Sequence, residues 1–409
     1  MWKSRSLPVA AAFVCGAGAG AAVTRQSRGA TRNDNDSKSA PESPQPSPVD
    51  RFARPVTLMD AIGNTPLLEL TSVSRLTGCK IYAKAEFMNP CGSIKDRPAK
   101  YLILDAEARG VLPSGGTIIE ATGGSTGIAL TQMAAARGYK TALTMTERTA
   151  QEKVELMKVL GATVHVHPDV SLYDEDRADE HYYRAAKRLQ AATPDSVHLD
   201  QFENAASMRA HYETTAPEIW RQTQGHVDGF VVSSGSAGTI SGVSAFLKER
   251  SAKCLVWLIE PVEMTGLTTY VNSNRSNSYR RGDYELFPAR TEKSVTEGIG
   301  LPRVTANFRQ ARVDKGITGT NQEVVDMAYF LLRNDGIFVG PSSALNVIGA
   351  VKMARELGPG HTIVTVLCDT GARYRSKLYN REWLQAQNLV PPIDDPGKRP
   401  TTLDFVQQL

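Results

Sequence analysis

The chain has 409 residues, 41% of them hydrophobic and 22% charged, which is typical of a globular protein with a substantial buried core. The formal net charge is only +4 and the basic residues are dispersed, which argues against nucleic-acid binding. The five cysteines form no CxxC pair and the seven histidines form no metal-spaced cluster, so we expect neither a disulfide framework nor a metal site.

The first fifty residues differ in composition from the rest of the chain. A basic hexapeptide precedes an uncharged run of 17 residues, Leu7 to Val23, and no acidic residue occurs before Asp34. Three interpretations fit: a cleaved mitochondrial presequence, an uncleaved membrane anchor, and a disordered tail that carries no targeting signal. The first two predict a mitochondrial location, with residues 7–23 as an outer-membrane tether in the second, and the third predicts a cytoplasmic one. Residues 34–50 are polar and proline-rich, which predicts a linker.

From Arg54 onward, strand-like runs alternate with amphipathic helical patterns. Strands are predicted over residues 80–87, 116–122, 141–146, 162–167, 228–234, 254–261 and 362–369. Helical patterns over residues 125–138 and 150–161 each end at a glycine. The alternation predicts an α/β fold of two domains, with largely parallel sheets flanked by helices. Residues 272–294, rich in Asn, Ser and Arg, are predicted to form a long surface loop or a mobile segment.

Two glycine-rich connections lie where a strand is predicted to lead into a helix, the place where open parallel sheets bind ligands. The first is EATGGSTG at residues 120–127; the second is SSGSAGTISG at residues 233–242, with a helix predicted to start near Ser241. The N–H groups of Gly235 to Thr239 can converge on an anion, and phosphate is the favoured choice. The loop lacks the GK[ST] ending of a nucleotide P-loop, and a tight turn without a ligand explains it equally well on its own.

A third stretch, NPCGSIKDR at residues 89–97, places Lys95 in a polar turn ahead of a helical run. A lysine partly removed from water loses its proton readily and can form a Schiff base with a carbonyl compound. Surface lysines are far more common than catalytic ones, so the interpretation of Lys95 as catalytic depends on all three stretches together.

Together these stretches resemble the pyridoxal phosphate-dependent cysteine synthase and cystathionine β-synthase family, which has fold type II, the tryptophan synthase β-like fold. Further family segments recur in order: AIGNTPLLEL at 61–70, TEGIG at 296–300, VGPSSALN at 339–346 and LCDTGARYRSKLYN at 367–380. The resemblance covers residues 55–390. Its last segments look closest to the mitochondrial cysteine synthase 2 branch.

The resemblance implies a role for each stretch. Lys95 would bind pyridoxal 5′-phosphate as a Schiff base and move the α-proton of the substrate. The other cofactor-binding residues would be Gly235, Ser236, Ala237, Gly238 and Thr239 at the phosphate, Ser342 at the pyridine nitrogen and Ser125 at the 3′ oxygen. The substrate carboxylate would be held by Thr122, Gly123, Gly124, Ser125 and Thr126, assisted by Gln201.

The sequence departs from the family pattern in these loops. Where TSGNTG is usual, Gly123 replaces a serine and Ser125 replaces an asparagine. Cys91 replaces a glycine, and SGSAGT replaces GTGGT. We therefore predict that the cofactor binds but that the rate or the substrate choice is altered. Cys91 is interpreted as a small buried residue in preference to a redox-sensitive thiol.

The resemblance also implies the domain organisation. Residues 1–50 would be a targeting or anchor segment and linker, residues 51–88 and 206–395 a large cofactor-binding domain, residues 89–205 a smaller mobile substrate-binding domain, and residues 396–409 a tail.

The predicted reaction is that of a homodimeric cysteine synthase, which converts O-acetyl-L-serine and sulfide into L-cysteine and acetate. No histidine precedes His165, which argues against a haem-bearing cystathionine β-synthase. The alternatives are cysteine desulfhydration, another β-replacement such as cystathionine or cyanoalanine formation, and a catalytically weak interaction protein that binds the cofactor.

Overall fold

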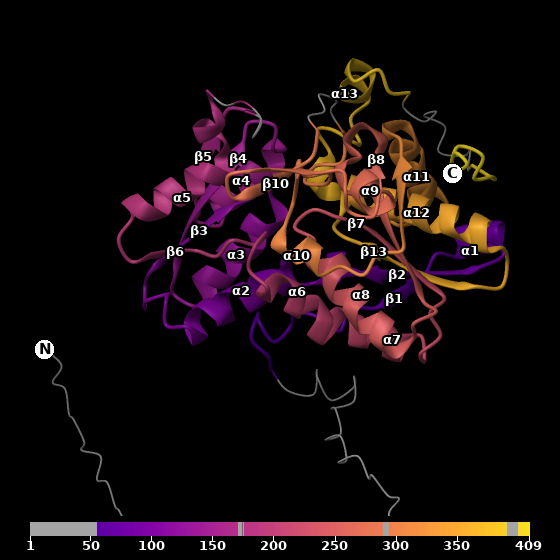
Figure 1. Cartoon of the computed structure of the whole chain (residues 1–409), viewed down its shortest axis with the longest axis horizontal. Coiled ribbons are helices and arrows are strands. Elements are labelled where there is room, and N and C mark those ends of the chain that lie inside the picture. The colour runs from indigo at the N-terminus through magenta and orange to yellow at the C-terminus, as the bar shows by residue number, and fades with distance from the viewer. Residues whose placement is uncertain (1–54, 171–173, 175, 289–293, 391–399) are drawn as a thin grey trace, which may run out of the picture. The chain divides into compact units, whose positions relative to one another are not determined.

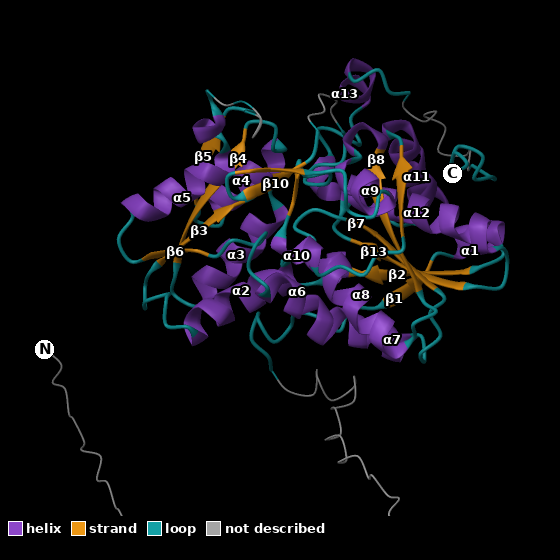
Figure 2. Ribbon diagram, viewed as in Figure 1, coloured by secondary structure: helices purple, strands orange, loops and turns teal. Residues whose placement is uncertain are grey.

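A computed structural model describes residues 55–170, 174, 176–288, 294–390 and 400–409. The contacts of this part belong to one compact unit, residues 48–409, which contains two largely parallel sheets with helices packed on them (Figure 1, Figure 2). The uncharged run at residues 7–23 and the linker at residues 34–50 lie outside the described residues. In the part of the chain that is described, no helix is both long and apolar enough to cross a bilayer.

The larger sheet has six strands in the order β1-β2-β13-β7-β8-β12. These strands are β1 (Leu67–Glu69), β2 (Lys80–Ala85), β13 (Thr362–Leu367), β7 (Gly229–Ser233), β8 (Leu255–Pro261) and β12 (Lys315–Gly319). Only β1 pairs antiparallel; the other neighbours in this sheet are parallel. The central strand β7 is buried along its whole length, as expected for a parallel strand covered on both faces.

Both faces of the larger sheet are covered because side chains alternate along each strand. Phe230 and Val232 of β7 pack into a cluster with α8 (Gly238–Arg250), while Val231 between them packs into a second cluster with α11 (Asn321–Asn334) and α12 (Pro341–Leu357). Burying one such large apolar side chain stabilises the fold by roughly 1.5–3 kcal/mol. The sheet is therefore a rigid support for the loops at its edge.

The smaller sheet has four parallel strands in the order β5-β4-β3-β6. These are β5 (Thr163–His167), β4 (Lys140–Thr146), β3 (Thr117–Ala121) and β6 (Ser196–His198). Helices α2 (Asp96–Ala108) and α3 (Ser125–Ala136) share a buried cluster with Ile118 of β3, and α5 (Tyr182–Ala192) shares another with Ile119. Helix α4 (Gln151–Val159) packs beside α3.

The remaining elements connect and cover the two sheets. The helices are α1 (Thr71–Thr77), α6 (Ala206–Ala210), α7 (Ala216–Gln222), α9 (Gly266–Asn272), α10 (Ala306–Arg309) and α13 (Arg381–Ala386). A small antiparallel sheet contains β9 (Tyr279–Arg281), β10 (Tyr284–Leu286) and β11 (Arg303–Val304).

The predicted α/β architecture is confirmed, and each predicted strand is present with its ends shifted by at most two residues. Two predictions are wrong. The helix after the second glycine-rich connection begins at Gly238 and not near Ser241, because the chain is already helical once Ala237 has completed the turn. Residues 272–294 contain the hairpin of β9 and β10 and are not simply a loop. The division into a small domain at residues 89–205 and a large one stays a prediction.

Candidate active site

A cavity of about 540 Å³ lies among the loops that follow strands of both sheets. It is lined by every residue predicted to bind the cofactor or the substrate: Lys95, Thr122, Gly123, Gly124, Ser125, Thr126, Gln201, Gly235, Ser236, Ala237, Gly238, Thr239 and Ser342. The loop after β3 comes from the smaller sheet and the loop after β7 from the larger one, so the carboxyl ends of both sheets meet at the same cavity. Proximity in one cavity is established; the individual roles of these residues stay predictions.

Lys95 lies at the start of α2, deep in the protein but open to the cavity. Burial lowers the pKa of its ammonium group, and this effect outweighs Cys368 and Asp369, which raise the pKa. A lysine with a lowered pKa has a larger neutral fraction, which is the form that attacks a carbonyl carbon or accepts a proton.

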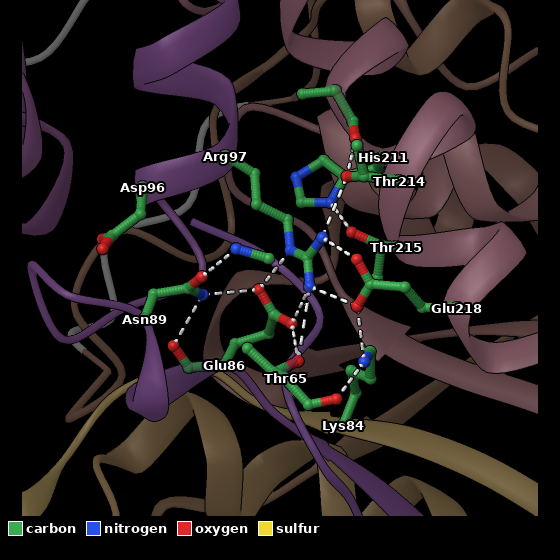
Figure 3. A network of polar contacts seen from close by, with 12 residues as sticks. Thr65, Lys84, Glu86, Asn89, Asp96, Arg97, His211, Thr214, Thr215 and Glu218 are labelled. Carbon is green, nitrogen blue, oxygen red and sulfur yellow. Dashed lines mark hydrogen bonds and ion pairs between the residues drawn. The ribbon is translucent and has the colours of Figure 1, made fainter. Parts of the chain in front are cut away.

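The turn that carries Lys95 is fixed by side chains of its own sequence. The Asn89 amide donates to the Glu86 carboxylate at 2.9 Å (Figure 3). It also donates to the carbonyl oxygen of Ser93, at 3.2 Å. The Asp96 carboxylate accepts hydrogen bonds from the N–H of Cys91 and from the N–H and hydroxyl of Ser93. Asn89 and Asp96 of the NPCGSIKDR stretch therefore hold the turn in its shape.

Arg97, two residues after Lys95, is held between two buried carboxylates (Figure 3). It donates to Glu86 and Glu218 through bonds of 2.7 and 2.8 Å to each, and Lys84 Nζ lies 2.6 Å from Glu218 Oε2. Two cations face two carboxylates, so the buried charges balance. Burial raises the pKa of Glu218, but Arg97 and Lys84 together lower it to about 2. This network fixes the first turn of α2 to the larger sheet.

The first glycine-rich connection folds into the turn that opens α3. Thr122 Oγ1 accepts hydrogen bonds from the N–H groups of Gly124 and Gly127, at 3.0 and 3.3 Å. The Thr126 hydroxyl donates to Gln201 Oε1 at 2.8 Å, and Gln201 Nε2 donates to the carbonyl oxygen of Ala121 at 2.9 Å. Gln201 therefore ties the first turn of α3, where the helix dipole favours an anion, to the end of β3.

Gly124 is required at this turn by its backbone conformation and by a neighbouring side chain. Its φ is 135°, and a Cβ atom there would lie 2.4 Å from Cδ of Lys153. The Lys153 ammonium lies 2.7 Å from Glu297 Oε2 and 4.2 Å from the centre of the Tyr374 ring. Lys377 also pairs with Glu297.

Ser125 contacts the segment that follows β13. Its Oγ donates to Asp369 Oδ2 at 3.1 Å and accepts from Arg373 Nη1 at 2.9 Å. Tyr374 Oη also donates to Asp369 Oδ2, at 2.9 Å, and Arg373 Nη2 donates to the carbonyl oxygen of Cys91.

The second glycine-rich connection is shaped by close backbone contacts. A Cβ atom at Gly235 would lie 2.5 Å from the carbonyl oxygen of Gly298, and one at Gly238 would lie 2.6 Å from that of Ser207. Ala237 has a φ of 70°, in the left-handed region. Next to the loop, the Ser233 hydroxyl is buried and has no hydrogen-bond partner among the described residues. A tight loop at the positive end of the 13-residue helix α8 is suited to a phosphate.

A histidine that the sequence interpretation missed supports this loop. His211 Nε2 lies 3.2 Å from Thr239 Oγ1, and His211 Nδ1 lies 2.9 Å from Thr215 Oγ1. Burial lowers the pKa of His211 well below its usual value, so the imidazole is neutral. One ring nitrogen therefore donates and the other accepts, which fixes the Thr239 hydroxyl.

Two cysteines lie near the cavity. Cys368 lines it beside Ser342 and Lys95, and burial raises the pKa of its thiol to about 11. Cys91 is 4% exposed, and burial raises the pKa of its thiol above the usual range. Both sulfur atoms are therefore protonated at neutral pH, which supports the interpretation of Cys91 as a buried filler.

The other side chains missed from the sequence are Lys153, Glu297, Asp369, Arg373 and Tyr374. Glu297 lies in TEGIG, and Asp369, Arg373 and Tyr374 lie in LCDTGARYRSKLYN. Both segments resemble the family pattern, but the resemblance assigned no role to these four residues. The contacts of Asp369 and Arg373 with Ser125, and of Glu297 with Lys153, join residues more than one hundred positions apart, where no local pattern connects them.

The family model "Pyridoxal-phosphate dependent enzyme" matches residues 58–369. The chain belongs to this family. The predicted family, its fold and its cofactor, pyridoxal phosphate, are confirmed.

Relatives of this pyridoxal phosphate enzyme match over most of their length. A cysteine synthase of Dictyostelium discoideum is 45% identical over 81% of this chain and 86% of its own. A Saccharomyces cerevisiae relative whose description names a mitochondrial cysteine synthase is 38% identical over 81% of this chain and 84% of its own. The crystal structure of the O-acetylserine-dependent cystathionine β-synthase of Helicobacter pylori has a TM-score of 0.68 and 31% identity, over 79% of this chain and 98% of its own.

The residues present fit pyridoxal phosphate. The loop at residues 235–239 lines the cavity at the N-terminus of α8, the buried Ser233 hydroxyl has no hydrogen-bond partner among the described residues, and Lys95 opens to the same cavity.

Proposed function

We propose that the chain is a cysteine synthase that converts O-acetyl-L-serine and sulfide into L-cysteine and acetate. The observation that carries the proposal is the cavity in which Lys95, the loop at residues 122–126 and the loop at residues 235–239 meet. The names of the relatives support the same reaction.

The chemistry divides between the cofactor and the chain. When bound, pyridoxal phosphate draws electrons away from the α-carbon of the amino acid joined to it. The loop at residues 122–126 holds the α-carboxylate at the start of α3, and Gln201 keeps Thr126 in place. Lys95 takes the proton from Cα. The Cβ–O bond then breaks with loss of acetate, a Cβ–S bond forms to sulfide, and Lys95 returns the proton to Cα.

Cystathionine formation is the second candidate. The Helicobacter pylori relative carries this activity in its title, and the cavity extends from Lys95 to Lys377 and Trp383 near α13. A cavity of about 540 Å³ is large enough for a thiol bigger than sulfide beside the cofactor.

Product analysis of the purified full-length holoenzyme separates these functions. O-acetylserine is supplied with sulfide or with homocysteine, and cysteine is supplied alone. The proposal expects cysteine from the first mixture at the highest kcat/KM. Cystathionine as the preferred product would establish the second candidate, sulfide release from cysteine alone a desulfhydrase, and no turnover with bound cofactor an interaction protein.

We also propose a mitochondrial location, supported by the basic and uncharged pattern at residues 1–32 and by the name of the Saccharomyces cerevisiae relative. Fusions of residues 1–50 to a fluorescent protein test it. A presequence should give a shortened fusion that is released in soluble form when the mitochondria are opened; retention at full length in the outer membrane indicates an anchor.

We also propose that the protein is a homodimer, on the basis of the family resemblance. Light scattering of the purified holoenzyme measures its mass and tests this proposal.

A further inference from the structure

The Ser125 hydroxyl is already engaged on its donor side. A hydroxyl has one hydrogen to donate and two lone pairs to accept with. Ser125 gives its hydrogen to Asp369 Oδ2 and accepts from Arg373 Nη1. Because Ser125 also lines the cavity, the remaining lone pair is what it offers to a ligand there.

The two partners hold this orientation firmly. Asp369 is 3% exposed and accepts a second hydrogen bond from Tyr374 on the same oxygen. Arg373 is 8% exposed, and its other terminal nitrogen donates to the carbonyl oxygen of Cys91. A guanidinium carries no acceptor and an ionised carboxylate carries no donor, so neither partner can exchange its role with Ser125.

We propose that Asp369 and Arg373 are positioning residues that fix the Ser125 hydroxyl as a hydrogen-bond acceptor toward the cavity. The group that meets Ser125 there must then be a donor. An asparagine in its place would present an NH₂ group and could donate, so the serine reverses the direction of the hydrogen bond.

The consequence for the cofactor rests on the proposed assignment of Ser125 to the 3′ oxygen of pyridoxal phosphate. This oxygen is phenolic and donates a hydrogen bond only while it keeps its proton. Ser125 therefore stabilises the protonated form of the ring oxygen at the expense of the deprotonated form. The visible spectrum of the bound cofactor reports the ratio of the two forms, because they absorb at different wavelengths.

Ser125→Ala in the full-length holoenzyme removes the acceptor. The ratio should shift toward the deprotonated form by about two- to tenfold, the effect of one hydrogen bond between neutral groups. Glu152→Gln is the matched control, because Glu152 of α4 also contacts the segment after β13, where it accepts hydrogen bonds from Ser376, but it does not line the cavity. Its spectrum should match that of the wild type, and an equal shift there would overturn the proposal.

A double-mutant cycle tests the positioning role itself. Asp369→Asn also removes a charge near Lys95, and this direct effect is present both with and without the Ser125 hydroxyl. The part that Asp369 exerts through Ser125 appears as coupling with Ser125→Ala, which should be about two- to tenfold in the ratio. Arg373→Lys in the same cycle replaces Asp369→Asn if that variant does not fold.

The possible failures are distinguishable. Additive effects in the cycle with Asp369→Asn, or in the cycle with Arg373→Lys that replaces it, would overturn the positioning role. An unchanged ratio in Ser125→Ala would overturn the assignment of Ser125 to the ring oxygen. A wild-type protein that holds no cofactor would overturn the proposed function.

Discussion

The two glycine-rich loops of the cavity are built on different principles. The loop at residues 235–239 is shaped by backbone contacts: the carbonyl oxygens of Ser207 and Gly298 leave no room for a Cβ atom at Gly238 or Gly235. The loop at residues 122–126 is held by side chains, through the contacts of Thr126 with Gln201 and of Ser125 with Asp369 and Arg373.

This difference indicates how each loop can vary. A loop that is shaped by backbone contacts, such as residues 235–239, tolerates a change from GTGGT to SGSAGT as long as small residues remain where the contacts are close. A loop held by side chains changes its hydrogen-bond pattern with each substitution, so Gly123 and Ser125 are the places where the properties of this enzyme should depart from those of its relatives.

Lys95 lines the same cavity as both loops, and its replacement should have the largest effect on activity. Lys95→Ala should lower cysteine formation by at least about 10²–10⁴-fold, because the group that moves the α-proton is gone. The rate is measured with O-acetylserine and sulfide, and the visible Schiff-base band should disappear with it. Lys253→Ala, an exposed lysine remote from the cavity lining, should retain the wild-type rate. Full turnover in Lys95→Ala would exclude the proposed role.

The ion-pair network behind Lys95 anchors the turn to the larger sheet, and its loss should affect stability. Glu218→Gln leaves Arg97 and Lys84 without one carboxylate charge and should cost about 3–5 kcal/mol at neutral pH. Glu218 has a pKa of about 2 in the fold against 4.5 for a free side chain. Because the folded pKa is the lower one, the charged form stabilises the protein above pH 4.5 and this stabilisation is lost as the pH falls toward 2.

Thermal unfolding of the wild type and Glu218→Gln at several pH values measures this effect. The difference in Tm should be largest above pH 4.5 and shrink below it. A difference that stays constant as the medium becomes acidic would show that the Glu218 charge does not stabilise the fold.

Two matched substitutions compare the loops directly. Gly238→Ala forces a Cβ atom against the Ser207 carbonyl oxygen and should weaken pyridoxal phosphate binding by about 5- to 150-fold, from roughly 1–3 kcal/mol of overpacking. Gly123→Ala meets nothing within 4 Å and should leave cofactor affinity unchanged. Both affinities are measured by fluorescence titration of the apoenzyme. Equal losses in the two variants would contradict the distinction between the loops.

The smallest effect is expected from the side-chain contact in the carboxylate loop. Thr126→Val removes the hydroxyl that donates to Gln201, which should cost about 1 kcal/mol and raise the KM for O-acetylserine about fivefold. Cofactor affinity should stay near the wild-type value, and steady-state kinetics with a cofactor titration separate the two. A larger loss of cofactor affinity than of substrate affinity would assign Thr126 to the other ligand.

The sequence was sufficient to predict the parallel α/β arrangement, because buried strands such as β7 read as continuous apolar runs. It was also sufficient to predict which residues line the cavity, since each lies in a short segment that resembles the family pattern. It did not predict the hairpin of β9 and β10, whose short and partly exposed strands lack an apolar pattern. The contacts of Ser125 were not predictable either, because Asp369 and Arg373 are more than 240 residues away and the donor direction depends on their geometry.

The central claim is that Lys95 carries the cofactor in a cavity that also contains Lys153 and Lys377. Borohydride reduction of the purified holoenzyme fixes the Schiff base, and peptide mass spectrometry then locates the modified lysine. We predict the cofactor adduct on Lys95. An adduct on Lys153, on Lys377 or on a lysine outside the cavity would contradict the account.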